Sequence, residues 1–280
     1  MGEPQAPLVA STPPALASQF DMPSVFTVTR VRQENYRIRT FYFDRALASK
    51  PGQFVMLWLP GVNERPISIR QSDPLTVSVA NVGEYSSKVY ALKPGNKVGI
   101  RGPYGNSFEL EGKNVLLVGG GYGLMPLYFL ATVARKAGVK TTLAIGARTA
   151  ADVTMESDFK AEGCRVFVST DDGSKGEKGY CTLAADRLLA KEKFSAVYGC
   201  GPELMEAELV RVCAKRKTPV YVSVERKMKC GFGICGECAF GDKLACAHGT
   251  IFSGEQLAKN PEFGKTFLDW GGKSRPFAKA

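Results

Sequence analysis

Four cysteines near the end of the chain are the residues with the most specific chemistry. They fall within 17 positions, in the pattern Cys230-x4-Cys235-x2-Cys238-x7-Cys246. Thiolates bind soft or borderline metals, and four of them complete either one zinc tetrahedron or the two irons of a [2Fe–2S] centre. The first three follow the C-x4-C-x2-C spacing of plant-type ferredoxin loops, although the fourth is much closer than in those proteins. Because structural zinc sites usually use paired C-x2-C units, the spacing favours iron and sulfide and leaves zinc as the alternative.

Two further features of this segment bear on the kind of centre. Gly231, Gly233 and Gly236 are interleaved with the cysteines. Glycine lets backbone N–H groups turn inward toward bridging sulfides, which tunes the potential of a cluster. A Rieske centre requires two histidine ligands, and the chain contains only His248. A Rieske centre is therefore excluded, and His248 is expected to be a solvated neighbour of the site.

A glycine-rich turn forms the second candidate site. Gly119-Gly120-Gly121-Tyr122-Gly123 follows the apolar run 115–118 and precedes a predicted helix, 124–137. Gly120, Gly121 and Gly123 would let a pyrophosphate approach backbone N–H groups at a helix N-terminus. The turn departs from G-x-G-x-x-G because Pro126 occupies the place of the third glycine. A tight strand–helix turn without a ligand is the alternative.

Two loops expected at one edge of a parallel sheet could complete a dinucleotide site. Cys200-Gly201-Pro202 follows the predicted strand 196–199, and a small thiol there would lie beside a nicotinamide. Asp172, in the loop after the predicted strand 165–169, could meet a ribose. The alternatives are a buried cysteine before a helix and an ordinary turn.

Two short segments in the first half of the chain could hold a flavin. In Arg65-Pro66-Ile67-Ser68 the arginine can pair with a pyrophosphate, and the serine hydroxyl can contact a flavin nitrogen. Gly83, Ser86 and Ser87 offer backbone N–H groups and hydroxyls of the kind that cradle phosphate. The alternatives are structural: a barrel strand with a surface arginine, and a hairpin turn.

The periodicity of the chain changes at about residue 113. Before it, short strands such as 54–59 and 75–80 recur about every ten residues between Gly and Pro pairs, which predicts an antiparallel barrel or sandwich. After it, apolar strands alternate with helical stretches such as 151–161, which predicts a doubly wound parallel sheet. We therefore expect an Ala/Pro-rich arm (1–21), a β-barrel (22–112), a nucleotide domain (113–223), a small cysteine module (224–256) and a C-terminal tail (257–280).

Composition limits the class of protein. The chain has 280 residues, 44% apolar and 23% charged, which excludes disordered, collagen-like and disulfide-scaffold classes. Its net charge of +10 fits an anionic ligand or partner. A cysteine cluster plus scattered single cysteines indicates a reducing compartment, so we expect a cytoplasmic location, and the N-terminus does not read as a signal peptide. The uncharged run 114–134 contains four glycines and Pro126, which argues against a membrane span.

Taken together and in this order, these segments resemble the ferredoxin–NADP reductase superfamily. Over residues 22–256 the chain looks more closely like the electron-transfer subunits of class 1B dihydroorotate dehydrogenase, since the cysteine module follows the flavin and nucleotide motifs. The resemblance implies FAD, NAD(H) and a [2Fe–2S] cluster as cofactors. After Cys246 the family commonly reads x-Asp-Gly-Pro-Val-Phe, where this chain has Ala247-His248-Gly249-Thr250-Ile251-Phe252.

The resemblance also implies roles for particular residues. Arg65 and Ser68, with Pro66 and Ile67 between them, would hold the FAD pyrophosphate and isoalloxazine. Gly83, Ser86 and Ser87 would contact the FAD phosphates, with Ser86 where the family commonly has threonine. NAD(H) would be framed by Gly120, Gly121, Gly123, Asp172, Cys200, Gly201 and Pro202, with Ser68 and Cys200 beside the reacting rings. Cys230, Cys235, Cys238 and Cys246 would ligate the cluster.

A partner follows from the same resemblance. Electrons would pass to or from an FMN-containing catalytic subunit that oxidises dihydroorotate, in a heterotetramer with two copies of each chain. Homologous subunits of sulfhydrogenases and of NADH-dependent ferredoxin:NADP reductases are the alternatives. A zinc-knot protein that binds nucleic acid is a more remote alternative. The sequence argues against it, because basic and aromatic residues are not interleaved over any long stretch. We therefore expect neither nucleic acid nor a membrane as a partner.

Overall fold

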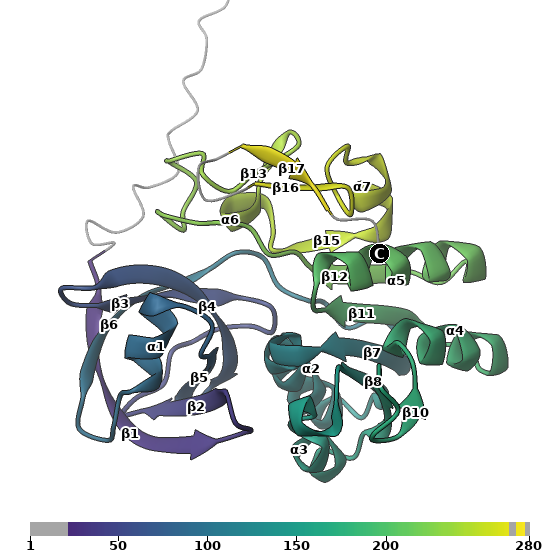
Figure 1. The fold of residues 1–280 in the computed structure, drawn as a ribbon, viewed down its shortest axis with the longest axis horizontal. Helices are drawn as coiled ribbons and strands as arrows, with labels where there is room; N and C mark the ends of the chain where they lie inside the picture. Colours follow the sequence, from purple (N-terminus) through teal and green to yellow (C-terminus); the bar gives the residue numbers. More distant parts are fainter. Residues whose placement is uncertain (1–21, 269–272, 278–280) are drawn as a thin grey trace, which may run out of the picture.

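The computed structural model describes residues 22–268 and 273–277. A barrel and a helix-covered sheet lie beside each other, and the C-terminal part of the chain lies across the same end of both (Figure 1). The expected arm, 1–21, lies outside the described residues. The predicted combination of an antiparallel barrel and a doubly wound sheet is confirmed.

The barrel is formed by six antiparallel strands. They are β1 (Ser24–Gln33), β2 (Ile38–Phe43), β3 (Phe54–Leu59), β4 (Asn63–Ser72), β5 (Leu75–Ala80) and β6 (Lys97–Tyr104). They close in the order β1-β2-β5-β4-β3-β6. Apolar side chains that point inward, among them Phe41, Val55, Leu57 and Val77, form its core.

One short helix in the barrel was not predicted. Residues 83–87, for which a hairpin turn was one alternative, begin the helix α1 (Glu84–Tyr90). The Ser86 hydroxyl oxygen accepts hydrogen bonds from the backbone N–H groups of Val82 (3.0 Å) and Gly83 (2.9 Å). A serine at the third position of a helix thus satisfies backbone donors that precede it, which is why the chain coils here instead of turning back.

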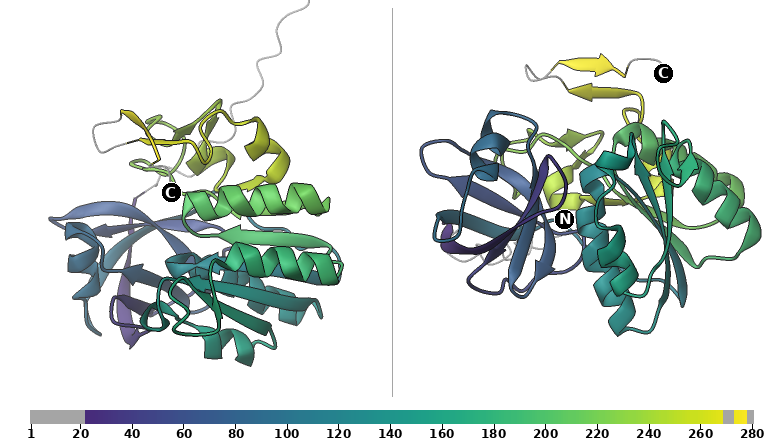
Figure 2. Two further views of the ribbon diagram at one scale, coloured as in Figure 1. Left: turned by 45° about the vertical axis from the view of Figure 1, so that its right-hand side comes forward. Right: turned by 60° about the horizontal axis from the view of Figure 1, so that its bottom comes forward.

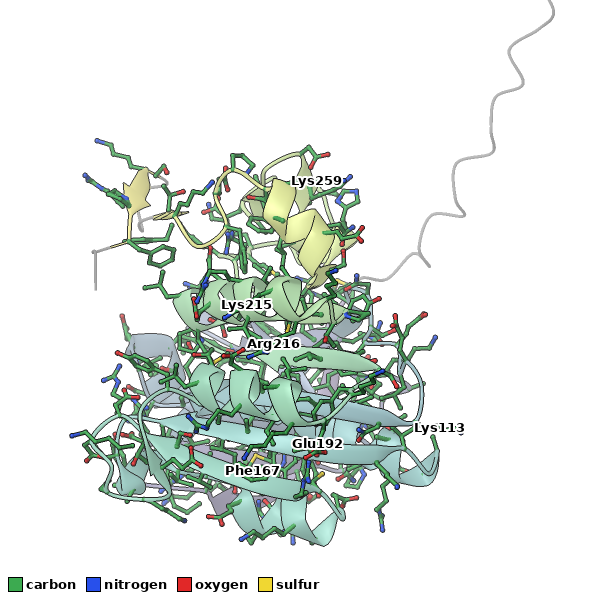
Figure 3. All side chains as sticks on the ribbon, turned by 90° about the vertical axis from the view of Figure 1, so that its right-hand side faces the viewer. Lys113, Phe167, Glu192, Lys215, Arg216 and Lys259 are labelled. Carbon is green, nitrogen blue, oxygen red and sulfur yellow. The ribbon has the colours of Figure 1, made fainter. Side chains whose placement is uncertain are left out.

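The second half of the chain forms a seven-stranded sheet. Its strands are β7 (Asn114–Gly120), β8 (Lys140–Ala147), β9 (Arg165–Thr170), β10 (Glu177–Lys178), β11 (Ala196–Cys200), β12 (Val220–Ser223) and β15 (Ile251–Ser253), in the order β10-β9-β8-β7-β11-β12-β15. The helical segments between them are η1 (Gly121–Gly123), α2 (Leu124–Lys136), η2 (Ala150–Asp152), α3 (Glu156–Ala161), α4 (Cys181–Lys191) and α5 (Glu203–Arg216). Figure 3 looks onto α4 and α5, where the labelled Arg216 pairs with Asp186 at 2.7 Å.

Helix α2 lies between the sheet and the barrel and is apolar on both sides. Leu127 and Leu130 pack into the core of the sheet, whereas Phe129 packs into the core of the barrel. A helix that is covered on two sides needs apolar residues around most of its circumference. This explains the long uncharged run, and no described helix is long and apolar enough to cross a membrane.

A buried ion-pair network also joins the two bodies. Arg70 of β4 is 4% exposed in its side chain and pairs with Glu34 at 2.8 Å and with Asp158 of α3 at 3.0 Å. Arg32 of β1 donates to Asp158 as well, at 3.0 Å. Charged groups buried in this way fix a geometry, because each lost partner leaves an uncompensated charge. The network therefore fixes the barrel relative to the sheet.

The C-terminal part contains the short elements β13 (Ala239–Phe240), β14 (Lys243–Leu244), α6 (Ala245–His248), α7 (Gly254–Lys259), β16 (Thr266–Leu268) and β17 (Ser274–Pro276). Strand β15 pairs antiparallel with β12, so the chain re-enters the seven-stranded sheet directly after the cysteines. The β16–β17 hairpin lies at the outer end of the molecule (Figure 2).

Candidate functional site

The four cysteines lie together between β12 and β15. Cys238 and Cys246 are buried, Cys230 is half-buried and Cys235 is exposed. The sulfurs of Cys238 and Cys246 are 3.2 Å apart, and the backbone N–H of Cys246 lies 3.4 Å from the sulfur of Cys238. Cys246 lies in helix α6, and Cys238 directly precedes β13. Their contact brings together two residues that are eight positions apart in the chain.

The loop from Cys230 to Cys235 turns backbone donors toward a sulfur. Burial raises the pKa of the Cys230 thiol, but the N–H groups of Cys235, Phe232 and Ile234 outweigh it and lower the pKa to about 6. Such donors stabilise a thiolate, the form that binds metals. The chain can bend in this way because Gly231 and Gly233 have φ values of +85° and +92°.

The donor set fits a two-iron cluster better than a single zinc ion. The sulfurs are grouped as one close pair, Cys238 with Cys246, and a second pair in which the side chain of Cys235 forms a hydrogen bond to that of Cys230. A zinc tetrahedron needs four donors about one point, whereas a [2Fe–2S] centre takes two thiolates on each iron.

Neighbouring polar residues stabilise the cysteine segment. Exposed His248 accepts a hydrogen bond at its Nδ1 from the backbone N–H of Leu244, at 2.9 Å, and so helps to form the turn before Cys246. Asn106, beyond the end of the barrel, accepts from the N–H of Ile251 at 2.8 Å and donates to its carbonyl at 2.8 Å. The segment is therefore fixed on both sides of its last cysteine.

The cysteine loop packs directly on the barrel. A Cβ added at Gly231 would lie 2.7 Å from Cγ of Met56 in β3. The ring of Phe232 lies 6.3 Å from that of Tyr104 in β6. Met56 is paired across the sheet with Pro66 of β4, in the segment expected to hold a flavin. The cysteine loop therefore packs on β3, the strand next to that segment.

The arginine of the flavin segment faces the helix that follows β5. Arg65 lies 6.0 Å from the ring centre of Tyr85 in α1. Burial holds the pKa of Tyr85 well above its usual range, with Arg65 lowering it and Glu64 raising it, and the Tyr85 hydroxyl donates to the Leu57 carbonyl at 2.6 Å. The structure thus brings Arg65 and the start of α1 together, although they lie on separate segments of the chain.

The serines predicted as flavin contacts differ in their surroundings. Ser68 is half-buried opposite Phe54. Ser86 and Ser87 both donate to the Gly83 carbonyl, at 3.0 and 2.8 Å, so their hydroxyls already hold the start of α1 in shape. Their local role is to build the helix end.

The glycine-rich turn and the loop after β11 lie side by side. Gly119 and Cys200 are paired on adjacent parallel strands. A Cβ at Gly123 would lie 2.2 Å from the Cys200 carbonyl oxygen, and one at Gly120 would lie 3.3 Å from Pro202. These two glycines therefore allow two loops to touch, which is a different role from the expected approach of a ligand.

Gly121 is the glycine that leaves space open. Its φ is +58°, and a Cβ there would have no heavy atom within 4 Å. Asp172 lies in the exposed loop after β9, where its carboxylate accepts from the backbone N–H of Ser174 at 2.9 Å. The carboxyl ends of β7, β9 and β11 thus carry the predicted residues along one edge, the usual place for a ligand in such a sheet.

Cys200 is 5% exposed, and burial raises the pKa of its thiol well above the usual range. It therefore stays a neutral thiol near pH 7 and can act by its shape and contacts. Its sulfur lies 4.0 Å from the carbonyl of Ser223 in β12.

Two acids beside Cys200 were not predicted. Glu206 is 1% exposed; its Oε1 accepts from the N–H of Gly201 at 3.1 Å, and its Oε2 has no partner among the described residues. Glu225 accepts from the Tyr122 hydroxyl at 3.3 Å; desolvation of its carboxyl by the surrounding protein raises its pKa, and the hydrogen bond from Tyr122 lowers it. Helical periodicity could have found Glu206, because it shares the buried face of α5 with Leu209. No sequence signal pointed to Glu225.

Glu206 gives stability a dependence on pH. Burial raises its pKa well above the ordinary 4.5, so the folded chain keeps a proton that the unfolded chain loses as pH rises. Stability contributed by this group is therefore fully present below the ordinary 4.5 and is lost progressively as pH rises above it. We expect Glu206→Gln to raise the melting temperature at about pH 8 and to change it little at about pH 5.

Thermal denaturation of the cofactor-loaded chain at both pH values measures this effect. Glu208→Gln is the matched control, because Glu208 lies on the same helix but is more exposed and pairs with Arg211 at 2.6 Å. An equal gain for Glu206→Gln at both pH values would contradict a proton held by Glu206.

Comparisons with known proteins agree with this geometry. Residues 225–258 match the model of the iron–sulfur cluster binding domain of dihydroorotate dehydrogenase B. A protein of Methanocaldococcus jannaschii named probable dihydroorotate dehydrogenase B (NAD(+)), electron transfer subunit, is 40% identical over 90% of this chain and 98% of its own length. A protein of Pyrococcus furiosus with the same name is 42% identical over 85% of this chain and 93% of its own length.

Solved structures give the same fold. An NADH-dependent reduced ferredoxin–NADP oxidoreductase, studied for flavin-based electron bifurcation, is 30% identical with a TM-score of 0.76 and covers 84% of this chain and 90% of that one. The ferredoxin reductase of a carbazole 1,9a-dioxygenase, at 23% identity and a TM-score of 0.62, shares the fold over 71% of this chain and 68% of that one. The resemblance inferred from the motifs is confirmed: the chain belongs to the family of electron-transfer subunits of NAD-dependent dihydroorotate dehydrogenase B.

Proposed function

We propose that this chain carries electrons between NAD(H), FAD and a [2Fe–2S] cluster, and exchanges them with an FMN-containing catalytic subunit that oxidises dihydroorotate to orotate. The observation that carries the proposal is the packing of the cysteine loop on β3, one strand away from Arg65-Pro66-Ile67-Ser68. Thiolate ligands next to the segment expected to bind the flavin are suited to electron transfer to and from that flavin, which a purely structural metal site would not require.

FAD would bind to the barrel, residues 22–112. Arg65 would pair with its pyrophosphate, together with Gly83, Ser86 and Ser87 at the start of α1, and the approach of Arg65 to Tyr85 supports this grouping. Pro66, Ile67 and Ser68 would line the isoalloxazine, with the Ser68 hydroxyl as a hydrogen-bond donor to a ring nitrogen. Because β4 is paired with β3 on one side and β5 on the other, its backbone is fixed and so fixes these contacts.

NAD(H) would bind along the carboxyl edge of residues 113–223. The open space at Gly121 supports its approach to the turn 120–123, and Cys200, Gly201 and Pro202 would form the wall beside the nicotinamide. Asp172 would meet a ribose hydroxyl, and with Asp171 it would repel a 2′-phosphate, which favours NADH over NADPH. The neutral Cys200 thiol would help to exclude water from the reacting rings.

The cluster would be held by Cys230, Cys235, Cys238 and Cys246 within residues 224–256. When bound, NAD(H) and FAD exchange a hydride, and the cluster takes and gives one electron at a time. The N–H groups that face the Cys230 sulfur would stabilise negative charge there. The reaction is compatible with a cytoplasmic location, which we propose for the chain.

The absorption spectrum of chain purified without oxygen tests the proposal. We expect flavin bands together with broad iron–sulfur absorption, and about two irons and two sulfides per chain. A colourless protein that contains zinc would overturn it.

The partner is tested by purification from cells under the same conditions. An FMN-containing chain should co-purify in equal amount, as expected for two copies of each, and the complex should reduce NAD with dihydroorotate. A complex that transfers electrons between NADH and ferredoxin instead would favour the second candidate function, which the 30% identity to a ferredoxin–NADP oxidoreductase suggests.

A further inference from the structure

We propose that Arg101 of β6 is a positioning residue. It holds Cys230, the first cysteine of the loop expected to bind the cluster, against β4, the strand that carries Arg65 (the flavin strand). The proposal rests on the proposed function, since it concerns the distance between two cofactors that this function requires. Arg101 lies outside every sequence motif described above, and its contacts join three separate segments of the chain.

The guanidinium of Arg101 binds both the flavin strand and the cysteine loop. Its Nε and Nη2 donate to the two carboxylate oxygens of Glu64, at 2.8 and 2.6 Å. The same Nη2 donates to the backbone carbonyl of Cys230 at 3.0 Å. Glu64 directly precedes Arg65 in β4. The guanidinium of Arg101 therefore links Glu64, the residue before Arg65, to Cys230.

Aromatic rings hold the guanidinium in this position. Its central carbon lies 5.5 Å from the ring centre of Phe232 and 5.8 Å from that of Tyr104, and its Nη1 lies 3.2 Å from the Tyr104 hydroxyl. The Arg101 side chain is only 9% exposed. Because Phe232 belongs to the cysteine loop, Arg101 contacts the loop at two points on either side of Gly231.

A bidentate arginine is suited to this role. Its fork fixes direction as well as distance on a carboxylate, and a lysine at the same place offers only a point charge. Electron transfer slows steeply as the gap between donor and acceptor grows. A small displacement of the Cys230 loop from β4 would therefore slow flavin-to-cluster transfer without affecting the exchange of hydride between NADH and flavin.

The test compares Arg101→Lys and Arg101→Gln with wild-type holo chain. Arg45→Gln is the matched control, since Arg45 lies in the same barrel and pairs with Asp44 at the surface, at 3.4 Å with 55% of its side chain exposed. We expect both Arg101 variants to reduce ferricyanide with NADH at the wild-type rate. Reduction of the cluster by NADH, followed by stopped-flow absorption, should be slower by about 10-fold or more.

Two further measurements separate positioning from folding. Iron and sulfide should remain bound, and the electron paramagnetic resonance spectrum of the reduced cluster should change in both Arg101 variants. Glu64→Gln, which weakens the same link from its other end, should change that spectrum too. The proposal is overturned if spectrum and cluster reduction stay as in wild type, or if ferricyanide reduction falls by the same factor as cluster reduction. A wild-type chain without iron would contradict the proposed function itself.

Discussion

Replacing Cys238 with alanine should remove the iron and sulfide of the chain while leaving its flavin in place. Cys238 is buried and its sulfur lies 3.2 Å from that of Cys246, so the substitution deletes half of the close thiol pair. Three thiolates cannot complete the ligand set of two irons. We expect iron content to fall about 10- to 100-fold or more.

The flavin-level reaction separates this outcome from unfolding. Cys238→Ala should still bind FAD and reduce ferricyanide with NADH, because the barrel and the nucleotide sheet have hydrophobic cores of their own. Cys164→Ala is the control, since Cys164 is also buried but lies between α3 and β9, away from the cysteine loop. Retention of about two irons per chain in Cys238→Ala would show that the ligand set is different.

Replacing Gly123 with alanine should impair both folding and nucleotide binding. The added Cβ would lie 2.2 Å from the Cys200 carbonyl oxygen and 2.8 Å from the Gly201 nitrogen, which are backbone atoms held by the pairing of β11 with β7. Gly123 has a φ of −62°, which alanine adopts freely, so the effect is steric alone. We expect a loss of about 1–3 kcal/mol of stability, because overpacked sites must shift their neighbours.

The catalytic effect of Gly123→Ala should be larger than its effect on stability. Separation of the turn from Cys200 by about 1 Å would displace residues 200–202, which we propose line the nicotinamide site. We therefore expect kcat/KM for NADH to fall about 100-fold. Gly138→Ala is the matched control: it lies past the opposite end of α2, it has open space around its Cβ, and its φ of +67° costs an alanine about 1–2 kcal/mol. Denaturant melts and ferricyanide reduction measure both variants, and wild-type kinetics in Gly123→Ala would refute the contact.

Strong periodic signals predicted the fold well. Strands β3 and β5 have the bounds expected from their apolar runs, 54–59 and 75–80. The helix expected over 151–161 is confined to α3 (Glu156–Ala161), because the β-branched pair Val153-Thr154 and a φ of +59° at Met155 break the coil. Helix α1 was missed because its start depends on the Ser86 hydroxyl, a local contact with no periodicity.

The candidate site was predictable where chemistry depends on spacing along the chain. Cysteine spacing predicted the cluster segment, and strand–turn–helix order predicted the glycine-rich turn. Arg101 and Glu225 were not predictable, since their partners lie on distant segments and only the folded chain brings them together. The roles of the glycines also needed the structure, because sequence alone does not tell a glycine that admits a neighbouring loop from one that admits a ligand.

Strand β15 has a consequence for how the cluster is assembled. Ser223 and Ile251 are paired on neighbouring strands, so both ends of residues 224–250 are anchored in one sheet. Pairing of these strands closes the loop, so its closure entropy is offset by the sheet and not by the metal. We therefore expect a chain stripped of its metal to keep the framework needed to take up iron and sulfide again.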